Sequence, residues 1–145
     1  MSREIVNPLN KPTPVLSPAV KIDNLVYTAG QVGVNPETGE LAGSGIQEQT
    51  KQVMENIKLL LEAAGSSMEK IIKCLVFITD MKDFQAMNEV YKSYFEKDPP
   101  ARSCVEVAAL ANPELIVEIE AIAIIQKKIV CRRPWEHSET TLFQE

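Results

Sequence analysis

The sequence predicts an α+β domain, a sandwich in which a mixed β-sheet of about six strands carries two helices on one face. The chain has 145 residues, which suits one domain with one core. Segments with strand and helix periodicity follow one another in the order strands, helix, strand, helix, strands. Two helices cannot cover both faces of such a sheet, so we expect self-association to bury the second face.

The first part of the chain predicts an extended arm and then strands. Residues 1–14 contain three prolines and are expected to form the arm. Apolar and polar residues alternate over residues 24–31, as in a half-buried strand. The segment 35–40, NPETGE, has the composition of a turn.

Two helices and a central strand are expected next. Apolar residues recur every three or four positions over residues 46–64, where Ser44 with Gln47 fits a capping box and Gly65 fits the stop. The apolar run 71–79 predicts a strand covered on both faces. A second helix is expected over residues 82–97, with an apolar stripe made of Phe84, Met87, Tyr91, Tyr94 and Phe95. Asp80 precedes it as a cap, and Pro99 and Pro100 close it.

The last strands are expected over residues 103–110 and 115–126. We therefore place the domain at residues 1–126. Residues 127–145 are polar for the most part and form a C-terminal extension for which the sequence indicates no role.

Composition and charge exclude several classes of function. The net charge of −5 disfavours binding to nucleic acid or to anionic membranes. We find no signal peptide and no apolar run long enough to span a bilayer. Three cysteines without close pairing favour a reducing compartment, and we expect a cytoplasmic protein.

Motifs for metals and cofactors are missing from the sequence. The single histidine, His137, lies in the polar extension, so a catalytic triad or a histidine-rich metal site would depend on that residue. The glycines form neither a dinucleotide-binding motif nor a P-loop. We expect no cofactor and no metal.

Arg102 is the first residue with chemical interest. It follows a double proline at the start of a strand, and its planar guanidinium can bind a carboxylate through two parallel hydrogen bonds. A surface arginine is the simpler interpretation of the local pattern. Cys104 shares a face with Arg102 and could contact a substrate, although no base is evident that would make it a nucleophile.

Three further polar residues lie within apolar patterns. Glu118 and Glu120 share one face of a strand with isoleucines, so they face water, meet a cation or line a cleft. A carboxyl group in a cleft can hold water or move a proton. Asn88 falls near the buried stripe of the second helix, where its amide needs partners, or else it is solvated.

Taken in order, several segments resemble one known family. The segments are YTAGQVGVNPETGEL, NIKLLLEAAG, VFITDMKDF, NEVYKSYF, PPARSCVEVAAL and VEIEAIA. Together they are similar to the RidA/YjgF family, which is also known as endoribonuclease L-PSP or translation inhibitor. The resemblance covers about residues 15–126.

This resemblance implies a chorismate-mutase-like fold and a homotrimer with its clefts between subunits. It implies hydrolysis of enamines and imines of the 2-aminoacrylate and 2-iminobutanoate type to 2-oxo acids and ammonia, without a cofactor. Arg102 matches the family's carboxylate-binding arginine and Glu118 its water-positioning glutamate. Cys104 matches a cysteine beside the bound substrate and Asn88 an asparagine near the cleft, whereas Gly30 and Gln31 fall in the family's S-G-Q turn, where Gly30 is expected to contact the substrate.

Two positions depart from the family pattern. Leu16 stands in place of a tyrosine and Ala29 in place of a serine, so two hydroxyl groups are lost from the substrate-binding lining. The substrate range is therefore open. Two other functions compete with the deaminase, namely a non-catalytic binder of 2-oxo acids and a ribonuclease. The acidic charge and the lack of a usable histidine argue against the ribonuclease.

Overall fold

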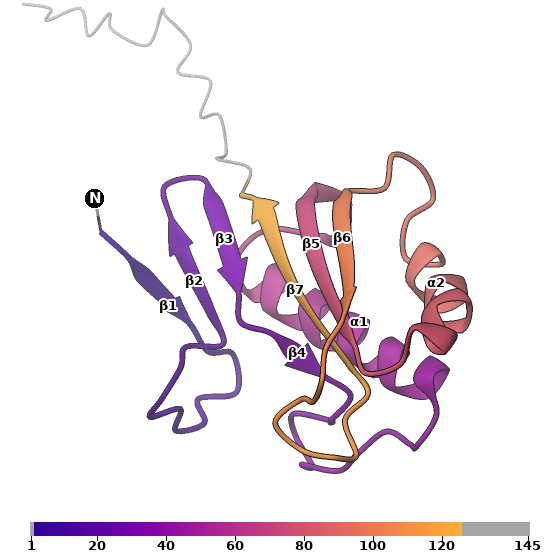
Figure 1. Cartoon of the computed structure of the whole chain (residues 1–145). Helices are drawn as coiled ribbons and strands as arrows, with labels where there is room; N and C mark the ends of the chain where they lie inside the picture. The colour runs from indigo at the N-terminus through magenta and orange to yellow at the C-terminus, as the bar shows by residue number, and fades with distance from the viewer. Residues whose placement is uncertain (1, 126–145) are drawn as a thin grey trace, which may run out of the picture.

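The computed structural model describes residues 2–125. The C-terminal extension, with His137 and Cys131, lies outside the described residues. The strands and helices follow in this order: β1 (Glu4–Val6), β2 (Ala19–Ile22), β3 (Leu25–Thr28), β4 (Gln31–Val32), α1 (Ile46–Ala63), β5 (Ile71–Ile78), α2 (Phe84–Lys92), β6 (Ala101–Glu106) and β7 (Val117–Ile124) (Figure 1). Single turns of 3-10 helix precede β5 and α2, at Met68–Lys70 and Met81–Asp83.

All the strands belong to one sheet. Its order is β1-β2-β3-β7-β5-β6, with β4 also paired to β7. β5 and β6 are parallel because α2 crosses between them, and the other pairs are antiparallel. The predicted mixed sheet is confirmed, with seven strands rather than about six. β1, which forms within the expected arm, and the short β4 have no counterpart among the expected strand segments.

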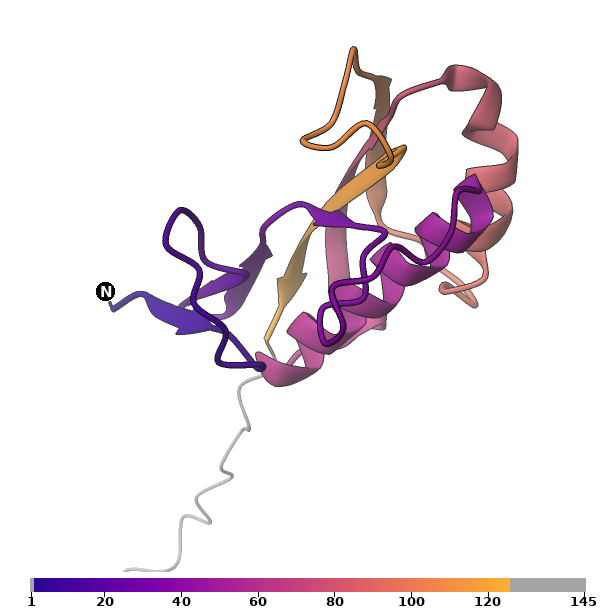
Figure 2. The ribbon, with the colours of Figure 1, turned by 90° about the horizontal axis from the view of Figure 1, so that it is seen from below.

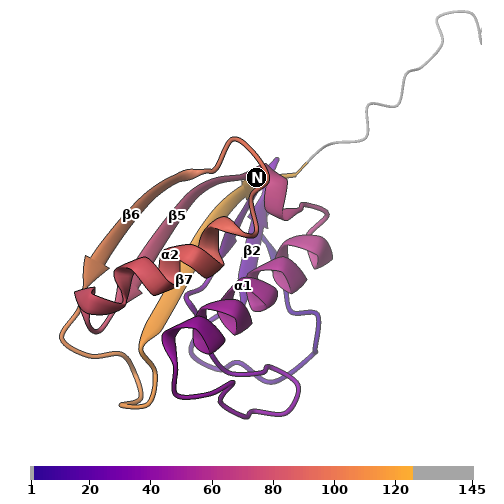
Figure 3. The ribbon, with the colours of Figure 1, turned by 90° about the vertical axis from the view of Figure 1, so that its right-hand side faces the viewer.

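Both helices pack on the same face of this sheet (Figures 2 and 3). The core lies between the two layers and holds the alternate residues of the central strands. They pack against the apolar stripes of the helices. The fully buried members include Val26, Val76, Val117, Ile119, Ile57, Leu61 and Met87. The α+β class and the placement of two helices on one face are therefore confirmed.

The opposite face of the sheet has no helix over it in the part of the chain that the structure describes. The expectation that residues 71–79 are covered on both faces is wrong for the isolated chain, because alternate residues of β5 remain partly exposed. Apolar side chains on this open face reach exposed fractions of 41% at Tyr27, 42% at Val105 and 40% at Ile124. An apolar face of this kind is typical of an interface.

α1 begins and ends at glycines. Its N-cap is Gly45, whose N–H donates to the Glu48 side chain at 3.2 Å, so the expected pair Ser44 and Gln47 is wrong. Glutamate fits this position because its charge also meets the positive end of the helix. At the other end Gly65 has φ +85°, as the sequence predicts for a residue just past the last turn.

α2 is shorter than expected. The Asp80 side chain accepts from the Lys82 N–H at 2.9 Å, which confirms the cap, but a 3-10 turn intervenes before the α-helix. The helix ends at Lys92 instead of 97, because the Ser93 hydroxyl donates to the Val90 carbonyl at 2.6 Å and the following turn tightens. Neither helix within residues 2–125 has the length and hydrophobicity that crossing a membrane requires.

Candidate active site

Arg102 lies on the helix-covered side of the sheet. It is level with Cys74 on β5, which is buried beneath the helices. From there its side chain reaches α2, where Nη1 donates to Asn88 Oδ1 at 2.7 Å. The crossover from β5 through α2 to β6 is what brings these two residues together. Asn88 is therefore a partner of Arg102 and not a solvated surface residue.

Two aromatic rings of α2 also contact the guanidinium. Its carbon Cζ lies 4.7 Å from the ring centre of Tyr91 and 5.6 Å from that of Phe84. Such distances are typical of cation–π contacts. The sequence pattern assigned both rings only to the apolar stripe of the helix. Their spacing from Asn88, four residues before and three after, is the signal that could have indicated a shared site.

No carboxylate lies within ion-pair distance of Arg102 in residues 2–125, where the ion pairs found join Lys21 to Glu4 and Lys92 to Glu89. The guanidinium is half-buried and its one hydrogen-bond partner there is a neutral amide. A partly desolvated cation in this state has a strong preference for an anion. The surroundings of Arg102 are suited to binding an anionic group from outside the chain.

Cys104 and Cys74 lie on the same side of the sheet as Arg102. Burial raises the pKa of the Cys104 thiol, and the nearby guanidinium opposes this rise only in part. Burial likewise raises the pKa of Cys74. Burial thus favours the neutral thiol form of both groups.

Glu118 lies on the opposite, open side of the sheet. Glu118 is paired with Phe77 on β5. Phe77 is separated from the buried Cys74 by an odd number of positions, so Phe77 and Glu118 both project to the face away from the helices. Burial raises the pKa of the Glu118 carboxyl, and the charge of neighbouring Glu120 raises it further. A carboxyl with a raised pKa can exchange a proton closer to neutral pH than an ordinary one.

Gly30 gives the Glu118 carboxylate room. A Cβ at position 30 would lie 1.9 Å from Glu118 Oε1, so only glycine allows this approach. A hollow of about 250 Å³ lies beside Gly30. It is lined by the N-terminal segment, which includes Leu16, by the first residue of β4 and by the second half of α1. Ala29 lies next to Gly30, half-buried, with its N–H donating to the Pro18 carbonyl at 2.8 Å.

The predicted site residues thus form two groups in one chain. Arg102, Asn88 and Cys104 belong to the helix-covered side. Glu118 and Gly30 belong to the region of the open side and β4. The structure does not bring Arg102 and Glu118 together within one chain, because they project from opposite faces of the sheet.

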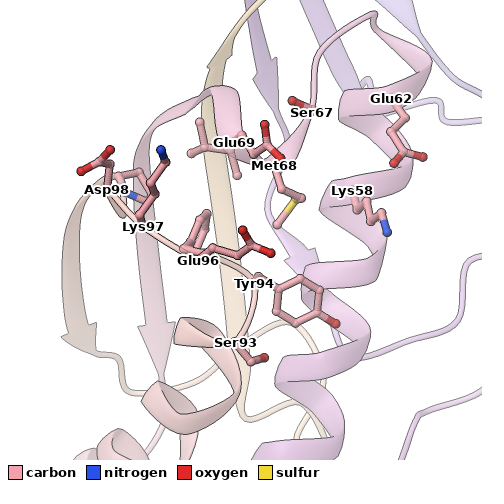
Figure 4. A pocket seen from close by; sticks show the side chains of 13 residues that line it. Lys58, Glu62, Ser67, Met68, Glu69, Ser93, Tyr94, Glu96, Lys97 and Asp98 are labelled. Carbon is pink, nitrogen blue, oxygen red and sulfur yellow. The ribbon is translucent and has the colours of Figure 1, made fainter.

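A hollow of about 570 Å³ lies elsewhere, between α1 and the connection from α2 to β6 (Figure 4). Four carboxylates line it, together with only two lysines: Glu62, Glu69, Glu96, Asp98, Lys58 and Lys97. An excess of carboxylates repels an anionic ligand. None of the predicted site residues lies in it. Over residues 2–125 there is also no cluster of three His, Cys, Asp or Glu side chains that could hold a metal ion.

Comparison with known proteins identifies the family. The family model described as Endoribonuclease L-PSP matches residues 9–125. The chain belongs to the endoribonuclease L-PSP family, also called RidA/YjgF. The predicted resemblance is thereby confirmed.

Members of the RidA/YjgF family match this chain over most of its length. A RutC family protein of Pyrococcus abyssi is 44% identical over 125 residues, covering 85% of this chain and 98% of that protein. The 2-iminobutanoate/2-iminopropanoate deaminase of Mus musculus is 40% identical over 124 residues, covering 84% and 91%. The structure of E. coli TdcF with bound serine is 40% identical, with a TM-score of 0.77 over 85% of this chain and 99% of that one.

Proposed function

We propose that this protein is a hydrolytic deaminase of enamines and imines that carry a carboxylate, of the 2-aminoacrylate and 2-iminobutanoate type. Water adds to the imine carbon, the carbon–nitrogen bond breaks, and the products are a 2-oxo acid and ammonia. An enamine first takes up a proton on carbon to become the imine. The supporting relatives are deaminases about 40% identical to this chain.

The single observation that carries this proposal is the guanidinium of Arg102, which has no anionic partner within residues 2–125. In the proposal it binds the substrate carboxylate through parallel hydrogen bonds. A solved relative, E. coli TdcF, holds serine, a small molecule that also carries a carboxylate. Binding at this point fixes the imine carbon for attack, and imines need only modest positioning to hydrolyse.

Glu118 is proposed to orient the attacking water. Its raised pKa suits a carboxyl that takes a proton from the water and returns one to the departing ammonia. Asn88 holds Arg102. Cys104, Gly30, Leu16 and Ala29 are proposed to line the bound substrate.

Because Arg102 and Glu118 project from opposite faces, we propose that each site takes Arg102 from one copy and Glu118 from another. A closed homotrimer, with three equivalent clefts, provides this arrangement. The exposed apolar side chains of the open sheet face support association of copies. The free thiols of Cys74 and Cys104 suit a reducing compartment such as the cytoplasm.

A coupled assay tests the activity. A dehydratase generates 2-aminoacrylate or 2-iminobutanoate in situ, semicarbazide traps the imine that escapes, and formation of the 2-oxo acid is compared with and without the protein. Arg102→Ala is expected to reduce turnover by at least about a hundredfold, because the carboxylate loses its only charged partner. Full turnover by an Arg102→Ala variant that is still trimeric overturns the proposal.

A non-catalytic binder of 2-oxo acids is the second candidate. The serine-bound relative favours it, as does the apolar hollow beside Leu16 and Gly30. A trimer that binds 2-oxobutanoate but accelerates neither imine in the coupled assay decides for the binder.

A further inference from the structure

We infer that Tyr91 and Phe84 are positioning residues, which hold the Arg102 guanidinium in one orientation so that its edge formed by Nε and Nη2 stays open for a planar carboxylate. This inference rests on the proposed function, since it concerns how the proposed carboxylate anchor is held. It assigns to two core aromatic residues a part in ligand recognition.

The three contacts come from one side of a single helix. Phe84, Asn88 and Tyr91 are spaced by four and then three residues, so they lie along one face of α2. Arg102, which lies on β6, meets all three side chains of that face. The helix thus supplies an amide between two rings, and the guanidinium lies against this surface.

The hydrogen bond to Asn88 decides which donors remain. A guanidinium has five N–H groups, and Asn88 Oδ1 takes one on Nη1. Within residues 2–125 no acceptor is found for Nε or Nη2. The edge that these two nitrogens form therefore keeps both of its parallel N–H groups, which is the arrangement that binds a carboxylate in a bidentate manner.

Aromatic rings suit this task better than an acidic partner. A carboxylate in their place would fix the guanidinium but would also neutralise it and compete with the ligand. A ring face attracts the cation and leaves its charge and its edge donors available. The buried Tyr91 stays an uncharged phenol, because desolvation raises its pKa well above the ordinary value.

The hydroxyl of Tyr91 takes no part in holding Arg102. It is buried without a hydrogen-bond partner of normal geometry within residues 2–125, and the thiol of Cys74 lies close to it. The ring of Tyr91, and not its hydroxyl, is therefore what holds Arg102. Two substitutions at this position should differ in their effect for this reason. Tyr91→Phe keeps the ring, whereas Tyr91→Leu removes it.

The test compares a charged ligand with its neutral analogue. The dissociation constants of 2-oxobutanoate and of 2-oxobutanamide are measured by calorimetry on the full-length trimer. Tyr91→Leu is expected to weaken 2-oxobutanoate roughly five- to thirtyfold, the value of a cation–π contact of about 1–2 kcal/mol. Tyr91→Leu should leave the dissociation constant of 2-oxobutanamide unchanged, and Tyr91→Phe should bind 2-oxobutanoate like the wild type. Phe84→Leu should cause a smaller loss, since its ring is the more distant.

Phe95→Leu is the matched control. Phe95 packs on Tyr91, with ring centres 5.1 Å apart, and no contact of its ring with Arg102 is found in the described chain. This variant should keep the wild-type constant for 2-oxobutanoate. If Tyr91→Leu does not assemble, Phe84→Leu against Phe95→Leu decides the question in the same assay.

The outcomes separate this inference from the proposed function. If Arg102→Ala loses 2-oxobutanoate binding while Tyr91→Leu and Phe84→Leu keep it, the positioning role is wrong and the carboxylate anchor stands. An equal loss with Tyr91→Phe and Tyr91→Leu would assign the effect to the hydroxyl and also overturns the inference. If Arg102→Ala binds 2-oxobutanoate like the wild type, the proposed function itself fails.

Discussion

The helix-covered side of the sheet and its open side surround their charged residues in different ways. On the covered side, α2 provides Arg102 with an amide and two rings, so its position is fixed by contacts within one chain. On the open side, Glu118 has Gly30 against it and Glu120 two residues away, and no hydrogen-bond donor to its carboxylate is found within residues 2–125.

For the proposed site, this difference means that one half is prepared within the chain and the other half is left incomplete. The arginine is pre-organised for an anion before any partner arrives. The glutamate lies on a face with exposed apolar side chains, where a second copy can complete its surroundings. Substitutions on the covered side should therefore act within a chain, and those on the open side across chains.

Among substitutions on the open side, replacing Glu118 should have the largest effect on turnover. Glu118→Gln keeps the size of the side chain but cannot accept a proton from water, so kcat in the coupled assay should fall on the order of a hundredfold. Binding of 2-oxobutanoate should persist, because Arg102 is untouched. Unchanged kcat in this variant would remove Glu118 from the mechanism.

The pH dependence sharpens this prediction. The pKa of Glu118 is raised above 4.5, so kcat/KM should rise with pH through a midpoint above 4.5, and Glu118→Gln should lose this dependence. Glu120→Gln is the control, because removing the neighbouring charge should move the midpoint to lower pH without abolishing it.

The same shift affects stability. A carboxyl with a raised pKa favours the folded state fully below pH 4.5, and this contribution is lost as pH rises through its folded pKa. Glu118→Gln should therefore raise the melting temperature at pH 7 and have little effect below pH 4.5. We expect a loss of activity together with a gain of stability, because a partly buried functional carboxyl serves activity at the expense of stability.

Mixed trimers test directly whether the two halves come from different copies. Arg102→Ala and Glu118→Gln chains are each expected to be nearly inactive alone. After unfolding and refolding together in equal amounts, about one quarter of the sites should hold both native residues if the site spans two chains of a closed trimer. A site within one chain gives none. Recovery of activity to about this fraction, measured in the coupled assay, distinguishes the two arrangements.

Much of the fold could be read from the sequence because its patterns are long. The stripe of α1 extends over five turns and β5 over eight residues, so each period is distinct. β1 has three residues and β4 has two, too few to show a period, and both were missed. The end of α2 depends on the Ser93 hydroxyl, a local competitor for a backbone carbonyl that apolar periodicity cannot show.

For the site, the sequence indicated the residue types but not their arrangement. Alternation places Cys104 with Arg102 and Glu120 with Glu118, since each pair shares a strand. Whether Arg102 and Glu118 lie on the same face of the sheet depends on the register of β6 and β7 against β5. No local pattern in the sequence encodes this register. The aromatic partners of Arg102 likewise required the crossover geometry, which is why Tyr91 and Phe84 were assigned only to the core.

The smallest expected effect concerns the glycine beside Glu118. In Gly30→Ala the new methyl group would meet the Glu118 carboxylate, and this flexible side chain can turn aside at little cost in stability. In the proposed mechanism Glu118 orients the attacking water, which would then be misplaced, so kcat should fall roughly tenfold while 2-oxobutanoate still binds. Gly45→Ala is the control, because its Cβ would lie 3.4 Å from the nearest atom, an ordinary contact, at the start of α1. A Gly30→Ala enzyme with wild-type kcat would show that the close approach of Glu118 to Gly30 has no part in catalysis.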